Sequence, residues 1–478
     1  MFSHVRRPGS AREPVLEAAR SRQNPGTAAS PPKARSRIRG LIGSLAALSL
    51  AVAGGFVAAV PATAAEQEQR YIVVLKDGAD PGTAAATQQR GYGLTVSTVY
   101  REAVNGYAAT MTASAAARLA TDPGVDFVTV AREFKAPENP SASNQVAPNW
   151  RQRIGGTLPA DGGAKETVDV NVAVIDSGID ASHPDLNVRG GIDCSTGSPV
   201  KVTPTDKVGH GTFVAGVIGA KDNSQGVIGA APGTPLWSVR VVNDADVITE
   251  EMLICAIDWV TGTRKDNNAD NDIEVANISI GGPGADTADC GKGTDPMHYA
   301  ICRSVKAGVA YAVAAGNSSE DFARSVPATY DEVLTATAMA DFDGKPDGLA
   351  APVCGPDDWT KIGQLDDKPA FFSNFATEPK DKAHTVAAPG VCITSTSITP
   401  EGYAVAHGTS FASPAVAGSL ARCISEAECG GSAKDVMSQF LKATAAYNKE
   451  HHGFGFDGDP LRPIQGQYYG YLAQIAGY

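Results

Sequence analysis

Apolar residues follow a distinct pattern from about residue 166 to the end of the chain. Near-continuous apolar segments alternate there with segments of helical spacing. Apolar segments of this kind are typical of strands that are buried on both faces of a parallel sheet. We therefore predict an α/β domain with three layers, a parallel sheet covered by helices on both faces. The expected strands are 168–175, 236–242, 273–280, 308–315 and 333–340, and the expected helices begin near 210, 249 and 410 or cover 296–307.

Residues 66–135 show shorter, alternating elements. Turn signals separate strand patterns rich in β-branched residues from two alanine-rich helical segments. The order β-α-β-β-α-β is that of a ferredoxin-like α+β unit. The expected strands lie within 70–76, 96–111 and 125–133, and the expected helices cover 83–92 and 112–124.

The N-terminal segment, residues 1–65, predicts a signal peptide with a long basic leader. An apolar run at 41–60 follows three arginines and precedes a small-residue stretch, Pro61 to Ala65, typical of a cleavage site. The alternative is a membrane anchor, because 20 residues can just span a bilayer. Residues 135–165 are rich in Pro, Asn, Ser and Gly and read as a linker.

Charge and composition narrow the choice of partners. The chain has 478 residues and a formal net charge of −12, and after residue 65 it carries 31 basic and 50 acidic side chains. Nucleic-acid binding needs clustered Lys and Arg, so this balance argues against a nucleic-acid partner. We expect a secreted, extracellular monomer that has no membrane contact once the signal is removed.

All eight cysteines follow the predicted signal, which indicates four disulfides in an exported protein. Eight cysteines allow 105 pairings. The sequence does not fix the pairing, but short spacing favours Cys290–Cys302 and Cys423–Cys429, and Cys354–Cys392 and Cys194–Cys255 are then the expected remaining pairs. The alternative is metal binding, although the chain contains no Cys-x-x-Cys pair.

Three short segments carry candidate chemistry. They read Val-Ile-Asp176-Ser-Gly, Gly-His210-Gly-Thr and Gly-Thr-Ser410-Phe-Ala. A serine hydroxyl becomes a useful nucleophile when an imidazole takes its proton and a carboxylate orients the imidazole. The chain order Asp…His…Ser differs from the orders in chymotrypsin and the α/β-hydrolases.

These segments, with their flanking residues, resemble the subtilisin family of serine endopeptidases. The segments YIVVLKDG, VNGYAATM and DPGVDFV resemble the inhibitor prodomain of that family. The resemblance implies a secreted endopeptidase made as a self-processing precursor, with a prodomain at 66–138, a catalytic domain at 139–478 and a cut near 134–143. The alternative for the prodomain is an independent small binding domain.

The resemblance also implies further site residues. Asn317 and the Ser410 N–H would stabilise the oxyanion. Peptide substrates would lie along one wall of a broad, mostly apolar pocket and face a second wall. The first wall is Ser279, Ile280 and Gly281, and the second is Ala314, Ala315 and Gly316.

The family's calcium site is matched by Asp185, Asn223 and the carbonyls of Lys221, Gln225 and Val227. Oxygen ligands of these types suit Ca²⁺. The alternative is a turn without metal, and we expect no catalytic cofactor.

Two other functions compete with an endopeptidase. A non-peptidase hydrolase is disfavoured because Gly408-Thr-Ser410-Phe-Ala412 is not the Gly-x-Ser-x-Gly elbow of esterases. A catalytically inactive relative that only binds peptides is disfavoured because Asp176, His210, Asn317 and Ser410 are all present.

Overall fold

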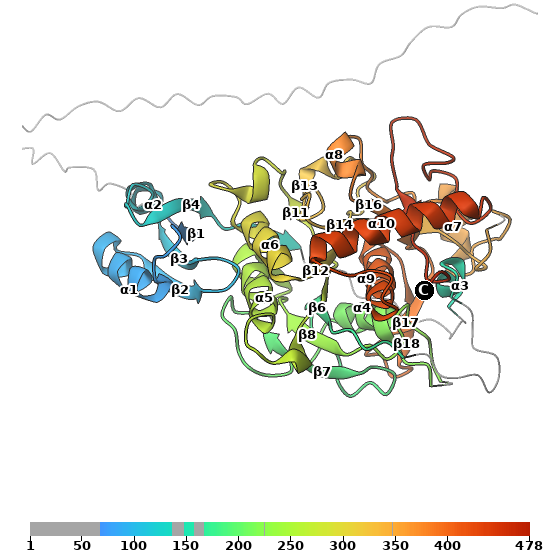
Figure 1. The fold of residues 1–478 in the computed structure, drawn as a ribbon, viewed down its shortest axis with the longest axis horizontal. Helices are drawn as coiled ribbons and strands as arrows, with labels where there is room; N and C mark the ends of the chain where they lie inside the picture. The colour runs from blue at the N-terminus through green and yellow to red at the C-terminus, as the bar shows by residue number, and fades with distance from the viewer. Residues whose placement is uncertain (1–66, 136–147, 157–166, 224, 347) are drawn as a thin grey trace, which may run out of the picture. The chain divides into compact units, whose positions relative to one another are not determined.

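The computed structural model describes residues 67–135, 148–156, 167–223, 225–346 and 348–478 (Figure 1). These residues belong to one compact unit that begins at Ala64. The predicted export segment and most of the expected cleavage segment lie outside the described residues. In the described part, no helix has the length and apolarity needed to cross a bilayer.

The N-terminal sheet has four antiparallel strands in the order β2-β3-β1-β4, with two helices, which confirms the ferredoxin-like prediction. Asp80 and Thr112 cap the helices by accepting hydrogen bonds from the backbone N–H of Thr83 and Ala115. The elements are β1 (Glu68–Leu75), α1 (Pro81–Tyr92), β2 (Thr95–Tyr100), β3 (Gly106–Thr112), α2 (Ala113–Leu119) and β4 (Val125–Val130).

Strand β1 is buried on both faces. Tyr71, Val73 and Leu75 belong to a small core with α1 and α2, whereas Ile72 and Val74 belong to the large core of the α/β domain. Successive side chains of a strand point to opposite faces, so this alternation places β1 between two cores. The four-stranded sheet therefore completes its burial only against the rest of the chain.

The large sheet has nine strands, and its main path runs β19-β16-β14-β12-β10-β6-β8-β7. All neighbours on this path are parallel, and β15 (Lys368–Pro369) pairs antiparallel with β14. The strands are β6 (Val172–Asp176), β7 (Val188–Asp193), β8 (Leu236–Arg240), β10 (Val275–Ile278), β12 (Ala310–Ala314), β14 (Leu334–Ala340), β16 (Thr385–Pro389) and β19 (Tyr471–Leu472).

Helices cover both faces of this sheet, which confirms the three-layer α/β prediction. Helices α4 and α9 pack against each other and the central strands, and α5 packs against α6 (Figure 1). The helices are α4 (His210–Gly219), α5 (Glu250–Thr263), α6 (Pro296–Ala307), α9 (Thr409–Ser425) and α10 (Ala433–Glu450). The shorter helices are α3 (Asn149–Arg153), α7 (Pro356–Ile362) and α8 (Pro379–Lys382).

Several predicted boundaries differ from the structure. The first buried strand begins at Val172 and not at 168, because the Val168 N–H bonds to the Pro232 carbonyl in a loop. Strands β7 and β16 and helix α10 were not predicted. A capping box formed by Ser432 and Asp435 begins α10, and this Ser-x-x-Asp pattern was its signal in the sequence.

All four predicted disulfides are present: Cys194–Cys255, Cys290–Cys302, Cys354–Cys392 and Cys423–Cys429. None of the eight cysteines, all of which the structure describes, is free. The alternative of a cysteine metal site is therefore wrong, because a disulfide sulfur offers no thiolate.

Candidate active site

Asp176 ends the buried strand β6, at the carboxyl edge of the parallel sheet. Its side chain is fully buried, and one carboxylate oxygen accepts the Ser177 N–H at 2.7 Å. Crevices outside the carboxyl ends of parallel strands are the usual place for ligands in such sheets.

His210 is the first residue of α4, and its ring is buried beside Asp176. Its Nδ1 lies 2.9 Å from one carboxylate oxygen of Asp176 and 3.0 Å from the other. The helix approaches very closely here, since a Cβ on Gly211 would lie 2.1 Å from the Gly178 carbonyl oxygen. Glycine at position 211 thus permits the contact between His210 and Asp176.

Asp206 was missed by the sequence analysis, although it holds the start of α4. One carboxylate oxygen accepts from the Ser177 hydroxyl and the N–H groups of Val208 and Gly209, at 2.8–2.9 Å. The other accepts from the Thr212 N–H at 2.9 Å and its hydroxyl at 2.7 Å. An aspartate just before a helix start is the signal that could have identified it.

Ser410 is the second residue of α9 and is half-buried. Its hydroxyl donates to the Ser279 carbonyl at 3.4 Å. Within the described residues, no hydrogen bond joins Ser410 to His210. The Phe411 ring lies 5.3 Å from the His210 ring, centroid to centroid, so the start of α9 stands beside the imidazole. The structure therefore brings Asp176 and His210 into contact, with Ser410 close by but turned toward β10.

A buried polar network fixes α9 against the end of β10. The Ser279 hydroxyl donates to the Ser410 carbonyl at 2.7 Å and accepts from the Asn277 amide at 2.9 Å. The Ser413 hydroxyl donates to the Asn277 side-chain oxygen at 2.7 Å. These bonds set the position of Ser410 relative to Ser279.

Asn317 follows β12 and is exposed. Its side-chain oxygen accepts from the Thr409 N–H at 2.9 Å and from the Thr409 hydroxyl at 2.8 Å, so its NH₂ group points elsewhere. A Cβ built on Gly408, where φ is +148°, would lie 3.5 Å from Asn317 Nδ2 and 3.6 Å from Ser410 N. The missing side chain of Gly408 leaves a small space flanked by two N–H donors.

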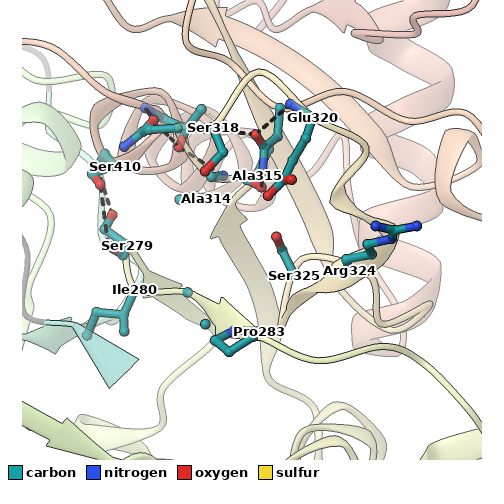
Figure 2. A pocket seen from close by; sticks show the side chains of 16 residues that line it. Ser279, Ile280, Pro283, Ala314, Ala315, Ser318, Glu320, Arg324, Ser325 and Ser410 are labelled. Atoms are coloured by element: carbon teal, nitrogen blue, oxygen red, sulfur yellow. Dashed lines mark hydrogen bonds between the residues drawn. The ribbon is translucent and has the colours of Figure 1, made fainter. Parts of the chain in front are cut away.

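A cavity of about 380 Å³ adjoins Ser410 (Figure 2). All six residues predicted for the two walls line it. Its lining also includes two charged side chains, so the expectation of a mostly apolar pocket is wrong. The additional polar lining residues, which sequence reasoning missed, are Ser318, Glu320, Arg324, Ser325, Asn374 and Thr409, the first residue of α9.

Four of these residues come from the segment 318–325, which follows Asn317 and runs into β13 (Ser325–Val326), the partner of β11 (Gly282–Pro283). Asn374 comes from the loop between β15 and β16. In Figure 2 the Glu320 side chain descends toward the pocket opposite the Ser325 hydroxyl, and Arg324 lies at the outer side. Only the tertiary fold brings these loops to the pocket.

The predicted calcium ligands gather around one carboxylate. Asp185 is 1% exposed, and burial raises its pKa. Its two oxygens accept from the Asn223 amide at 2.7 Å and the Val227 N–H at 3.2 Å, and its own carbonyl accepts the Lys221 N–H at 2.9 Å. The Gln225 N–H donates to the Asn223 side-chain oxygen at 2.9 Å. The Tyr403 hydroxyl also donates to Asp185 at 3.1 Å, and no lysine or arginine of the described ranges forms an ion pair with this carboxylate. Calcium binding here stays a prediction.

Two family models match the chain. A model described as the subtilase family matches residues 167–456, and a model described as peptidase inhibitor I9 matches residues 70–135. The first match spans most of the large α/β sheet, and the second spans the four-stranded sheet.

Individual relatives agree with these models. Subtilisin NAT of Bacillus subtilis subsp. natto is 32% identical over 362 residues, which cover 74% of this chain and 79% of the relative. A subtilisin of Bacillus pumilus is 34% identical over 284 residues, which cover 58% of this chain and 84% of the relative.

A solved structure shows the same fold. The epidermin leader peptide processing serine protease of Staphylococcus aureus matches with a TM-score of 0.60 and 18% identity, over 86% of this chain and 99% of its own. This likeness concerns the fold, whereas the two family models and the subtilisins show the family. The chain belongs to the subtilase family and is a subtilisin-like serine protease that carries an I9 inhibitor prodomain.

Proposed function

We propose that the protein is a secreted serine endopeptidase that hydrolyses peptide bonds through Asp176, His210 and Ser410. The main support is the contact of 2.9 Å between His210 Nδ1 and the buried Asp176, beside the start of α9. The carboxylate holds the imidazole with its proton on Nδ1, which leaves Nε2 free to accept the serine proton.

The reaction begins when the Ser410 hydroxyl turns from the Ser279 carbonyl toward His210. Only the Ser410 side chain has to rotate. The hydrogen bond of 3.4 Å to the Ser279 carbonyl is weak, so it opposes this rotation little. Ser410 Oγ then attacks the peptide carbonyl, its proton passes to His210, and His210 later protonates the leaving amine. A water molecule then attacks the acyl-enzyme, with His210 again accepting the proton, and this step releases Ser410.

The oxyanion forms in the space beside Gly408. Asn317 Nδ2 and the Ser410 N–H flank this space, and the bonds from Thr409 orient the Asn317 amide. Donors fixed in this way stabilise the negative charge as it develops. Removal of one such side-chain donor costs about 10²–10³ in kcat, a magnitude known from subtilisin itself.

The peptide substrate adds as a strand beside Ser279, Ile280 and Gly281. The side chain that precedes the scissile bond then enters the cavity between this wall and Ala314–Gly316. Glu320 gives that cavity a negative group, which favours a basic side chain at this substrate position.

We assign residues 1–65 to an export signal, 66–138 to the prodomain and 139–478 to the catalytic domain. Strand β5 (Glu133–Lys135) pairs antiparallel with β9 (Val247–Thr249), so the chain leaves the prodomain as a strand on the catalytic domain. This path supports self-cleavage within 134–143. The four disulfides support an extracellular enzyme, which acts as a monomer.

Calcium would be held by Asp185, Asn223 and the carbonyls of Lys221, Gln225 and Val227. It would neutralise the buried Asp185 carboxylate and rigidify the loop that follows α4. We expect chelation to lower the melting temperature of the wild type, with no such effect in the Asp185→Asn variant. Equal melting temperatures of the wild type with and without chelator would remove calcium from the proposal.

Self-processing tests the catalytic assignment. The Ser410→Ala precursor is expected to remain uncut, with prodomain and catalytic domain on one chain in denaturing gels and by mass. The Ser425→Ala variant, at the exposed end of the same helix, serves as a serine control and is expected to be processed. Efficient processing of Ser410→Ala would overturn the proposed mechanism, and a wild type that cleaves no peptide would favour the peptide-binding alternative.

A further inference from the structure

We propose that the loop of residues 194–198, tied to α5 by the Cys194–Cys255 disulfide, is a docking element for strand β2 of the prodomain. In consequence, this disulfide controls how tightly the catalytic domain retains its prodomain. The inference rests on the proposed function, in which the I9 prodomain is an intramolecular inhibitor of the self-processing precursor, and it adds the part of the surface that holds the prodomain.

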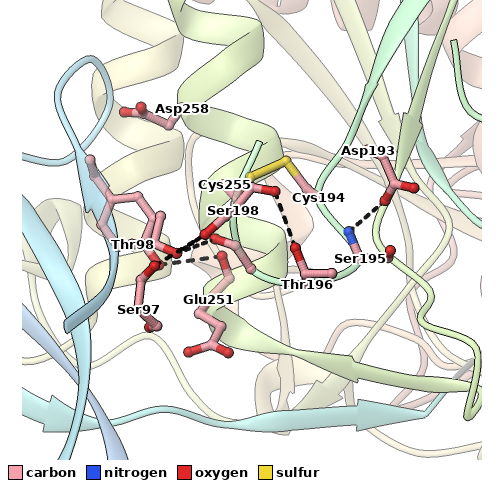
Figure 3. Close-up of a disulfide and its surroundings, with 12 residues drawn as sticks. Ser97, Thr98, Asp193, Cys194, Ser195, Thr196, Ser198, Glu251, Cys255 and Asp258 are labelled. Atoms are coloured by element: carbon pink, nitrogen blue, oxygen red, sulfur yellow. Dashed lines mark hydrogen bonds between the residues drawn. A yellow bond between two sulfur atoms is a disulfide. The ribbon is translucent and has the colours of Figure 1, made fainter. Parts of the chain in front are cut away.

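The loop meets β2 through short polar contacts (Figure 3). The Thr98 hydroxyl donates to the Gly197 carbonyl at 2.6 Å and lies 2.9 Å from the Ser198 hydroxyl. The Ser198 hydroxyl in turn donates to the Ser97 carbonyl at 3.1 Å. Thr98 is only 5% exposed, so the loss of its bond leaves a buried acceptor unsatisfied.

Cys255 of this disulfide lies on the face of α5 that contacts the prodomain. Glu251, Cys255 and Asp258 are spaced four and three residues apart, which places them on one side of the helix. Asp258 accepts the N–H groups of Glu102 at 2.8 Å and Ala103 at 2.6 Å, both from the prodomain. The helix face and the loop therefore act on the same end of the prodomain sheet.

Glu251 contacts both the prodomain and the loop of residues 194–198. Its carboxylate lies 2.7 Å from the Arg70 guanidinium of β1. A Cβ on Gly197, where φ is +80°, would lie 3.1 Å from Glu251 Cγ, so the loop backbone rests on this side chain. A larger residue at position 197 would push the loop away from α5.

The Cys194 N–H donates to the Arg240 carbonyl of β8 at 2.8 Å, and the other hydrogen bonds within the loop are local. The Gly197 N–H donates to the Cys194 carbonyl at 2.8 Å, and the Ser195 N–H donates to Asp193 at 2.9 Å. The disulfide instead joins positions 61 residues apart and fixes the loop on α5. Fixing a binding loop before its partner arrives lowers the entropy cost of association. Without the disulfide, β2 must order the loop as it docks.

The experiment compares two disulfide deletions in the full-length chain. The Cys194→Ala/Cys255→Ala variant, called the clamp variant, removes the disulfide that holds the loop of residues 194–198 on α5. Cys423→Ala/Cys429→Ala removes a disulfide at the end of α9 and is the matched control. After self-cleavage, activity on a short peptide appears as the prodomain dissociates. We expect this activity to appear about tenfold faster in the first variant and at the wild-type rate in the control.

Hydrogen exchange on full-length Ser410→Ala precursors gives a second readout that needs no activity. Removal of the 194–255 disulfide is expected to reduce protection of residues 95–100 and 194–198. Thr98→Val, which leaves both cysteines intact, is expected to speed release in the same direction, and Thr87→Val on α1 is the control.

Unchanged release and unchanged exchange of β2 in the clamp variant, together with a lower melting temperature, would show that the disulfide only stabilises the fold and would overturn the inference. Equal acceleration by both disulfide deletions would do the same. A failure of the proposed function is distinguishable, because then the wild type neither cleaves itself nor develops activity, while the exchange experiment still reports on docking.

Discussion

Asn317 in the catalytic cleft and Glu250 on the docking face, the surface of the catalytic domain that contacts the prodomain, differ in burial and in hydrogen bonding. In the cleft Asn317 is exposed, and its NH₂ group has no hydrogen-bond partner among the described residues. On the docking face Glu250 is 1% exposed, and both its carboxylate oxygens bind Arg132 of the prodomain, at 2.6 and 2.9 Å. A buried charge is costly unless it is paired, so Glu250 requires Arg132 as a bound partner. The exposed NH₂ group of Asn317 is instead suited to a substrate that binds transiently.

The same contrast extends to the apolar residues. The catalytic domain contains a large core of its own and all four disulfides, whereas the prodomain has no disulfide and shares Ile72 and Val74 with the larger core. A domain of about 60 residues buries too little surface to be strongly stable alone. The prodomain therefore gains much of its stability from docking.

The largest expected effect concerns the open donors of the cleft. In Gly408→Ala the new methyl group occupies the space beside Asn317 Nδ2 and Ser410 N, so kcat/KM for a short peptide is expected to fall by about 10²–10³. Gly430→Ala is the control, because a Cβ there meets no atom within 4 Å. A Gly408→Ala enzyme with near-normal kcat/KM would place the oxyanion elsewhere.

A smaller effect is expected on the docking face. Ile72→Ala leaves a cavity in the shared core and costs at least about 2 kcal/mol, or about 30-fold faster prodomain release after self-cleavage. The control Val130→Ala lies in the same sheet but is 49% exposed, so its release rate should stay near that of the wild type. If the two variants release at the same rate, the shared core does not hold the prodomain.

The charge of the cleft can be tested by substrate choice. Glu320→Gln is expected to lower the ratio of kcat/KM for lysine over leucine before the scissile bond by about tenfold, the size of a charge-assisted hydrogen bond. Glu426→Gln, an exposed carboxylate after α9, should leave this ratio unchanged. A preference for acidic residues that is lost in Arg324→Gln would reverse the assignment.

The smallest expected effect is a pH dependence of docking. Burial raises the pKa of Asp258 and of Glu251, and release of the prodomain returns these groups toward water. A carboxyl whose pKa is raised in the complex favours docking most below its ordinary pKa, and this contribution is lost as pH rises through the raised value. Release should therefore be a few-fold slower near pH 5 than near pH 8, and Asp258→Asn should flatten the profile. A profile with faster release in acid contradicts the sign.

Local sequence patterns determined much of this protein. The periodicity of buried strands and the two capped helices of the prodomain specify element types, because side-chain spacing alone decides which face of an element is apolar. Close cysteine spacing favoured Cys290–Cys302 and Cys423–Cys429. The other four cysteines still allow three pairings, so only the structure decides Cys194–Cys255 and Cys354–Cys392. Gly211, beside His210 in the sequence, is of the residue type that a close backbone approach requires, and the structure shows this approach to Gly178.

Only the tertiary structure decided how segments distant in sequence meet. The cap formed by Asp206, the empty space beside Gly408, the Ser410 hydroxyl turned to Ser279 and the Glu320 carboxylate in the pocket depend on such meetings. The docking of β2 on the loop after β7 is another example. No local pattern encodes these contacts, because each side chain's partner is set by the packing of whole layers and not by its neighbours in the chain.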